Sequence, residues 1–249
     1  MQLYIVRHGE SANNNLWSGQ DYDEYMAARL PDPPLTPIGE QQAELVAEHM
    51  AGTVHPENDN DRLGGSDRPG YGIDEIYCSA MFRAMQTAKP IGRELNLSPR
   101  IWIDIHEHGG MFHGNPRNGG VTSHAGLKRD EIAEQFTGYE IPDAVSNQGW
   151  WFGGYEEIET CEARAQRVAR TLHLWADERD NESAIAFVSH GTFVDRLLKA
   201  LFGHDFADRR LFYQHYNTAI TRIDFIKGGP LILHYLNRTR HLPPELTTK

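Results

Sequence analysis

The sequence is poor in the features that mark secreted, membrane-spanning and metal-stabilised proteins. It has only two cysteines, Cys78 and Cys161, in 249 residues. Their positions show no metal-ligand spacing, so we expect small buried thiols in a reducing compartment. No apolar run approaches the length of a membrane span, and the N-terminus lacks the basic start and long apolar segment of a secretory signal. These absences favour a cytoplasmic protein with no membrane partner.

Positive charge is also scarce. The chain has 24 lysines and arginines against 35 aspartates and glutamates, a formal net charge of −11 at pH 7. Such a chain has no basic excess to displace counterions, which argues against a general nucleic-acid binder. It remains compatible with a local basic site for a small anion. With 39% hydrophobic and 24% charged residues, the composition is that of a globular protein with a sizeable core.

Strand-like and helix-like segments alternate along the chain, without an internal repeat. Apolar runs predict strands near residues 3–6, 75–78, 100–105, 184–188, 219–226 and 231–236. Helical patterns cover residues 37–50, 80–95, 160–178 and 192–202. Thr36-Pro37 and Ser79 are candidate helix starts. We therefore predict an α/β fold in which a mostly parallel central sheet carries helices on both faces.

Three stretches interrupt this alternation. Residues 9–34 form a polar, turn-rich stretch, and residues 52–72 read as a long surface loop. Residues 108–155 are rich in glycine and contain one short helical pattern near residues 127–136. We interpret this last segment as a cap inserted over the C-terminal ends of the strands, within a single domain of residues 1–249. Its aromatic cluster, Trp150, Trp151 and Phe152, would pack the cap or line a substrate pocket, and packing is favoured.

Two tetrapeptides, Val6-Arg7-His8-Gly9 and Val188-Ser189-His190-Gly191, each place a histidine where a buried strand should end. A lone histidine there is commonly a polar loop residue. Ligands of parallel sheets bind outside the carboxyl ends of the strands, so His8, His190 and Glu107 should gather at one edge. With Arg7 and with Arg83, which opens a helix, they form a constellation suited to a phosphate group.

The chemistry of phosphoryl transfer explains these residue types. Arg7 and Arg83 offer planar forks of donors for two phosphoryl oxygens, and a neutral histidine nitrogen can attack phosphorus. A protonated second histidine would add a charged donor. The leaving oxygen needs a proton, for which Glu107 is the candidate, flanked by His106 and His108.

Two alternatives remain open at this level. His106, His108 and His113 could bind a metal together with Glu107, although no further ligand spacing supports this. The segment Asn217-Thr218-Ala219 could approach the site or form a plain turn.

Four segments resemble the histidine phosphatase superfamily, the phosphoglycerate-mutase-like proteins. They are LYIVRHGESANN (3–14), LTPIGEQQA (35–43), SAMFRAMQTA (79–88) and SHG (189–191). The resemblance implies that His8 is the phosphorylated nucleophile, that Arg7, Arg83 and His190 hold the phosphoryl group, and that Asn14 supports it. It further implies that Glu107 is the proton donor and that no metal or other cofactor is required.

No segment resembles the substrate-gripping Glu-Arg-His-Tyr-Gly of the cofactor-dependent mutases. We therefore expect a metal-independent phosphomonoesterase that acts on a small phosphorylated metabolite through a phosphohistidine. A phosphoglycerate-type mutase is the alternative. A non-catalytic phospho-ligand-binding or scaffold protein is a third possibility, which the complete set of His8, His190, Arg7 and Arg83 disfavours. The sequence identifies neither the leaving group nor the oligomeric state.

Overall fold

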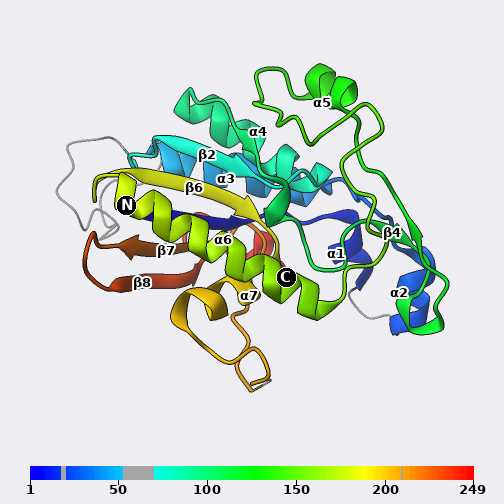
Figure 1. Ribbon diagram of the computed structural model, residues 1–249. Coiled ribbons are helices and arrows are strands. Elements are labelled where there is room, and N and C mark those ends of the chain that lie inside the picture. The colour runs from blue at the N-terminus through cyan, green and yellow to red at the C-terminus, as the bar shows by residue number, and fades with distance from the viewer. Residues whose placement is uncertain (18–20, 53–69, 209) are drawn as a thin grey trace.

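A six-stranded sheet organises the computed structural model, which describes residues 1–17, 21–52, 70–208 and 210–249 (Figure 1). The strand order is β3-β2-β6-β1-β7-β8. The strands are β1 (Gln2–Arg7), β2 (Glu75–Cys78), β3 (Arg100–Ile101), β6 (Ala184–Ser189), β7 (Ile220–Phe225) and β8 (Leu231–Arg238). β3, β2, β6 and β1 run parallel, whereas β7 and β8 are antiparallel additions at the edge. This confirms the predicted α/β fold with a mostly parallel sheet.

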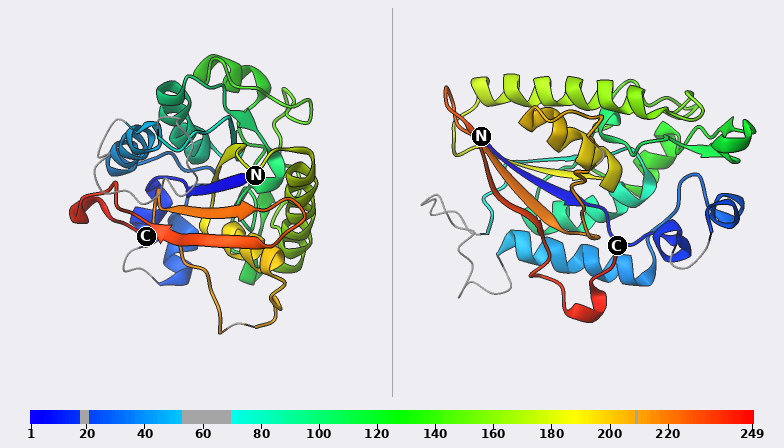
Figure 2. Two further views of the ribbon diagram at one scale, coloured as in Figure 1. Left: turned by 90° about the vertical axis from the view of Figure 1, so that its left-hand side faces the viewer. Right: turned by 90° about the horizontal axis from the view of Figure 1, so that it is seen from below.

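Four long helices cover the two faces of the sheet (Figure 2). One pair is α3 (Pro37–Ala51) with α4 (Phe82–Leu95), and the other is α6 (Ile158–Glu178) with α7 (Gly191–Phe202). The side chains of β1 alternate between the two cores: Tyr4 and Val6 join the α3–α4 side, and Leu3 and Ile5 join the α6–α7 side. Because both faces are covered, β1 and β6 are buried along nearly their whole length, which explains their continuous apolar runs.

The starts of two helices follow different rules. Thr36 caps α3 as expected, since its Oγ1 accepts a hydrogen bond from the amide of Gly39 at 3.1 Å. The expected cap at Ser79 was wrong, because α4 begins only at Phe82. Ser79 instead accepts from the amide of Met81, and the amide of Phe82 donates to Asp32 at 2.9 Å. A carboxylate fifty residues earlier in the chain thus caps α4.

Two further expectations need correction. The strand predicted over residues 100–105 ends at Ile101, and a 3₁₀ turn, η1 (Ile103–Ile105), follows it. In a strand, residues 103 and 105 would point to the same face of the sheet. The turn instead places Ile103 against the α3–α4 core and Ile105 in the α6–α7 core. The turn-rich stretch before Pro34 contains two short helices, α1 (Ala12–Trp17) and α2 (Tyr22–Ala28).

The glycine-rich segment 108–155 lies beyond the carboxyl ends of the parallel strands and beside α4 (Figure 1). It contains β4 (Phe112–His113), β5 (Thr122–Ser123) and α5 (Arg129–Gln135). Its middle packs on the main fold, where the hydroxyl of Tyr139 donates to the carbonyl of Met85. In the aromatic cluster, Trp150 is buried in the α3–α4 core, whereas Phe152 is exposed. Packing is therefore the correct interpretation for Trp150.

Several smaller expectations can also be compared with the structure. Cys78 and Cys161 are buried free thiols, as expected. None of the helices in the described part of the chain combines the length and apolar character that a membrane crossing requires. Most of the loop expected over residues 52–72 lies outside the described residues.

A close backbone contact fixes the loop after β1. A Cβ atom added to Gly39 at the start of α3 would overlap the carbonyl oxygen of Glu10, so these two backbones can touch only because position 39 is glycine. We expect Gly39→Ala to lower the free energy of unfolding by about 2 kcal/mol or more, through overpacking against backbone. Gly120→Ala is the control, because a Cβ there meets nothing within 4 Å. Urea denaturation measures both variants, and equal stabilities would contradict the proposed contact.

Candidate active site

A cavity of about 380 Å³ lies past the carboxyl ends of the parallel strands. Five of the residues expected at the site line it, namely Arg7, His8, Asn14, Arg83 and Glu107. His190 lies beside them, with its ring centroid 5.0 Å from that of His8. The remaining lining comes mainly from α1, α2 and the two ends of the 108–155 segment. The structure therefore brings the sequence-predicted residues together.

Hydrogen bonds define the tautomer of His8. Its Nε2 lies 3.1 Å from Nε of Arg83, which can only donate, so Nε2 is the acceptor and carries the lone pair. Nδ1 lies 2.7 Å from the carbonyl oxygen of Gly9 and donates to it. Burial, with the charges of Arg83 and Arg7, holds the pKa of His8 well below its usual range. The imidazole is therefore neutral at pH 7, with Nε2 directed to Arg83.

His190 is fully buried, and neither ring nitrogen has a hydrogen-bond partner among the described residues. Burial, with the charge of Arg83, also holds its pKa well below the usual range. The structure thus favours the neutral form of His190, not the protonated form considered from the sequence. An anion bound beside it would raise its pKa and engage its unpaired nitrogen.

Two arginines approach the His8 ring from different elements. Arg7, the last residue of β1, donates from Nη1 to the carbonyl of His215 at 2.6 Å. Burial lowers the pKa of Arg7 to about 10, so it stays charged at pH 7. Arg83, in the first turn of α4, has its pKa lowered by burial, an effect opposed by the charge of Asp32.

Asp32 is a site residue that sequence reasoning missed. Its side chain is only 8% exposed and lies 4.0 Å from Nη1 of Arg83. Besides this ion pair it accepts the amide of Phe82, so one carboxylate positions both α4 and the guanidinium that α4 carries. The available signal was an acidic residue held between Pro31 and Pro33 in an otherwise turn-like stretch.

The side chain of Glu107 is held by backbone amides of the first turn of α7. Its Oε1 accepts the amides of His108 and Phe193, and its Oε2 accepts the amide of Thr192, at distances of 2.8–3.1 Å. A carboxylate at a helix N-terminus is stabilised by the unpaired amides and the helix dipole. Three of its roughly four acceptor positions are used by the chain, which leaves one for a ligand.

Two asparagines support the loop around His8. Asn14 accepts from the amide and hydroxyl of Ser11 at 3.1 and 2.8 Å, and its amide N–H donors make no bond to the described residues. Asn217 donates to the carbonyl of His8 at 3.0 Å, and the amide of Thr218 donates to the carbonyl of Arg7. The late segment therefore approaches the site rather than forming a plain turn.

The three histidines weighed as metal ligands have separate surroundings. Nε2 of His106 lies 3.6 Å from Glu156, which Arg164 binds through two bonds of 2.6 and 2.9 Å. Although burial opposes it, these partners lower the pKa of Glu156 to about 2. His108 lines the cavity, whereas His113 is exposed next to a different histidine. This geometry offers the metal hypothesis no convergence of ligands among the described residues.

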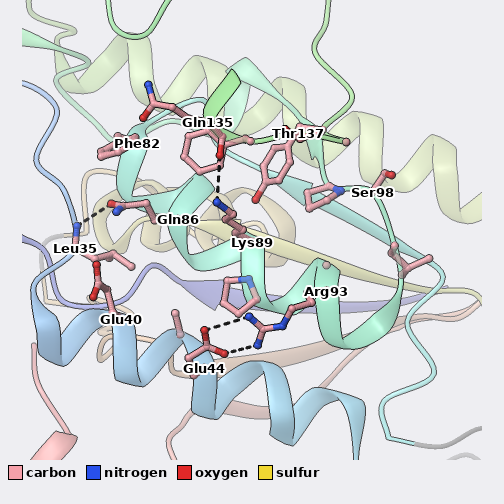
Figure 3. A pocket seen from close by; sticks show the side chains of 18 of the residues that line it. Leu35, Glu40, Glu44, Phe82, Gln86, Lys89, Arg93, Ser98, Gln135 and Thr137 are labelled. Atoms are coloured by element: carbon pink, nitrogen blue, oxygen red, sulfur yellow. Dashed lines mark hydrogen bonds and ion pairs between the residues drawn. The ribbon is translucent and has the colours of Figure 1, made fainter. Parts of the chain in front are cut away.

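A larger cavity of about 790 Å³ lies between α3, α4 and residues 135–139 (Figure 3). Its cationic side chains are already engaged: Arg93 forms a bidentate pair with Glu44, and Lys89 donates to the carbonyl of Gln135. The lining includes none of the histidines of the first cavity. The arginines and the histidine that the sequence singles out, Arg7, Arg83 and His8, therefore line the smaller cavity and not this one.

Comparison with known proteins agrees with this geometry. The model of the histidine phosphatase superfamily (branch 1) matches residues 3–59 and 62–238. A curated protein of Yersinia pestis (strain Pestoides F), a probable phosphoglycerate mutase, is 26% identical over 230 residues, which are 90% of this chain and 85% of that protein.

Solved structures share the fold over nearly the whole chain. Phosphoserine phosphatase of Entamoeba histolytica, in complex with 3-phosphoglyceric acid, has a TM-score of 0.59 at 22% identity, covering 97% of this chain and 99% of that one. A mycobacterial glucosyl-3-phosphoglycerate phosphatase has a TM-score of 0.57 at 18% identity, covering 96% and 99%. At these identities the likeness establishes the fold alone.

The burial of Asp32 predicts a pH effect on stability. Burial raises the pKa of Asp32 to about 6 from 3.8, against the opposing charge of Arg83, so the folded protein holds this proton more tightly than the unfolded chain. Ionisation of Asp32 therefore costs stability, by nothing below about pH 4 and fully above about pH 6. Relative to Asp32→Asn, the wild type should lose on the order of 3 kcal/mol in its free energy of unfolding as pH rises through this window.

Urea denaturation of both proteins across the window measures this difference. Asp177→Asn, which removes an exposed carboxylate on α6, is the matched control. A difference between wild type and Asp32→Asn that stays constant with pH would contradict a raised pKa at Asp32.

Proposed function

Since the chain belongs to the histidine phosphatase superfamily, we propose that it is a metal-independent phosphomonoesterase acting on a small phosphorylated metabolite through a phosphohistidine. The observation that carries the proposal is the neutral His8, whose Nε2 accepts a hydrogen bond from Arg83 in a cavity that Arg7 also lines. The superfamily contains phosphatases and mutases, so an enzyme acting on phosphate is the common ground. Two solved neighbours of the same fold are named phosphatases, which supports hydrolysis.

The first step forms a bond from Nε2 of His8 to phosphorus and breaks the bond from phosphorus to the leaving oxygen. Arg83 donates to Nε2 in this structure, and a bound phosphoryl group would take over this donor. Arg7, Arg83 and His190 spread their donors over the three peripheral oxygens, where charge must be stabilised. Asn14 adds its free amide N–H groups.

Glu107 enters the first step protonated, on the one oxygen lone pair that the three amides leave unused, and gives this proton to the leaving oxygen. In the second step water attacks phosphorus, the bond to Nε2 breaks, and Glu107 takes the proton of the water. Because two arginines already supply positive charge, neither step requires a metal.

A mutase is the alternative that a specific observation favours, since the curated relative at 26% identity is named a probable phosphoglycerate mutase. A mutase would return the phosphoryl group from His8 to an isomeric acceptor rather than to water. The missing mutase-like grip segment supports the hydrolase. A scaffold without turnover would form no phosphoenzyme.

We expect a covalent intermediate on His8. Rapid quench with a ³²P-labelled phosphomonoester, in EDTA, should trap acid-labile and base-stable label that is lost in His8→Ala. Turnover should fall by at least about 10⁴-fold in this variant, because no other nucleophile replaces Nε2. His124→Ala, which removes a histidine that does not line the cavity, is the control.

The same incubation separates the three hypotheses. Release of phosphate from 3-phosphoglycerate indicates a phosphatase, while formation of 2-phosphoglycerate without phosphate release indicates a mutase. Normal turnover by His8→Ala would overturn the mechanism. A requirement for a divalent ion after EDTA treatment would revive the metal site at His106 and His108.

Glu107→Gln should separate the acid from the phosphate-binding residues. Loss of the acid should slow hydrolysis of alkyl phosphates by about 10²–10⁴-fold and affect p-nitrophenyl phosphate much less, because nitrophenolate leaves without a proton. Arg83→Ala should impair both substrates, because it contacts the group that they share. kcat/KM for both substrates in both variants makes the comparison.

The glutamine exchanges one acceptor oxygen of Glu107 for a donor facing the amides of α7, so the variant's unfolding must be measured as well. An equal loss on both substrates in a folded Glu107→Gln protein would remove Glu107 from the acid role. His108, which lines the same cavity, would then be the next residue to test.

A further inference from the structure

A third arginine lines the active-site cavity and has no part in the mechanism above. Arg29 follows α2 directly, and its half-buried side chain lies over the ring of Phe112, with Cζ 4.2 Å from the ring centroid. Its Nη1 donates to the carbonyl of Phe112 at 2.9 Å. The stacking and this bond hold the guanidinium between α2 and β4, facing the cavity that both elements line.

The guanidinium of Arg29 is largely unused by the protein. Of its five N–H donors, only one makes a hydrogen bond to the described residues, and no described carboxylate forms an ion pair with it. Arg83, in contrast, has Asp32 at 4.0 Å and a bond to His8. The charge of Arg29 is close enough to lower the pKa of Arg83, after the larger effects of burial, Asp32 and Glu107. Arg29 repels Arg83, and no described carboxylate is paired with it to offset its charge. An arginine in this position is suited to an anionic ligand.

We propose that Arg29 binds a carboxylate on the leaving group of the substrate, so that the enzyme selects phosphomonoesters of small hydroxy acids. The inference rests on the proposed function for the position of the phosphoryl group at His8. A planar guanidinium fork matches a carboxylate, and its stacking on Phe112 reduces the entropy lost on binding. The cavity of about 380 Å³ is at the small end for ligand sites, which fits a substrate of a few carbon atoms.

Charge favours a carboxylate over a second phosphate. Three arginines, Arg7, Arg29 and Arg83, line the cavity, and Asp32 is paired with Arg83. With Glu107 protonated for the first step, the net is two positive charges. A phosphoryl dianion balances these charges, and a carboxylate then leaves one negative charge in excess, whereas a second phosphate leaves two. The chain as a whole carries −11, which further disfavours more highly charged ligands.

Two substrate pairs that differ in the carboxylate alone test the proposal. They are 3-phosphoglycerate with glycerol 3-phosphate, and O-phosphoserine with O-phosphoethanolamine. We expect wild type to prefer the acid in at least one pair. Arg29→Gln should lose about 10- to 100-fold in kcat/KM for that acid while changing its partner less than about threefold, as expected for loss of one charged, bidentate contact.

Arg117→Gln is the matched control. Arg117 also stacks on an aromatic ring beside the cavity, that of Tyr22, but it is exposed and does not line the cavity. This variant should keep the preference of the wild type. Arg29→Lys keeps the charge and loses the planar fork, so it should fall between wild type and Arg29→Gln.

Isothermal titration with the same four compounds in the His8→Ala background, alone and combined with Arg29→Gln or Arg117→Gln, tests binding independently of turnover. Tighter binding of the acid that disappears only in Arg29→Gln supports the proposal, even for a protein that forms no phosphoenzyme. No preference for the acids in either assay, or equal losses for acid and partner in a folded Arg29→Gln protein, would overturn it. Stronger binding of a bisphosphate without a carboxylate, propane-1,3-diol bisphosphate, than of 3-phosphoglycerate, dependent on Arg29, would replace the carboxylate with a second phosphate.

Discussion

The parallel pairing of β1 with β6 is the constraint on which the site depends. In this register Arg7 lies opposite Ser189, and the amide of His8 donates to the carbonyl of Ser189 at 2.9 Å. The next residue of each strand is a histidine, so His8 and His190 must leave the sheet side by side. A shift of one residue would turn every side chain of β1 to the other face and bury the wrong set. Apolar burial on both faces therefore also fixes the distance between the two imidazoles.

The same burial determines the charge state of the site. Both imidazoles are neutral because they are buried beside Arg83, whereas Arg7 keeps its proton even with a lowered pKa. The neutral ring of His8 keeps the lone pair on Nε2, and the nearby arginines make the potential around it positive. In water the same groups would have to be reoriented around the reacting phosphorus, and here the fold holds them in place before a ligand arrives.

How much of the fold and of the candidate site the sequence could predict depended on the kind of interaction involved. Apolar runs and helix patterns predicted the sheet and the long helices, because burial on two faces leaves a periodic trace. His8, Arg7, Arg83 and His190 followed from topology and family resemblance. Asp32 and Arg29 did not, since they act through contacts made fifty or more residues away along the chain, with Phe82 and Phe112. No local pattern records such contacts.

The two helices that the sequence did not predict, α1 and α2, line the same cavity. Together with the two ends of the 108–155 segment, they form the wall of the cavity that does not come from the sheet. Within this wall, α1 and α2 can change in sequence without disturbing the sheet, because neither helix contributes a residue to the two cores. Under the proposed function, the sheet would therefore determine where the phosphoryl group reacts, and the wall would determine which leaving group fits beside it. Within that wall, the positions with fixed charge, Arg29 above all, are where substrate preference should differ from that of relatives with the same His8 and His190.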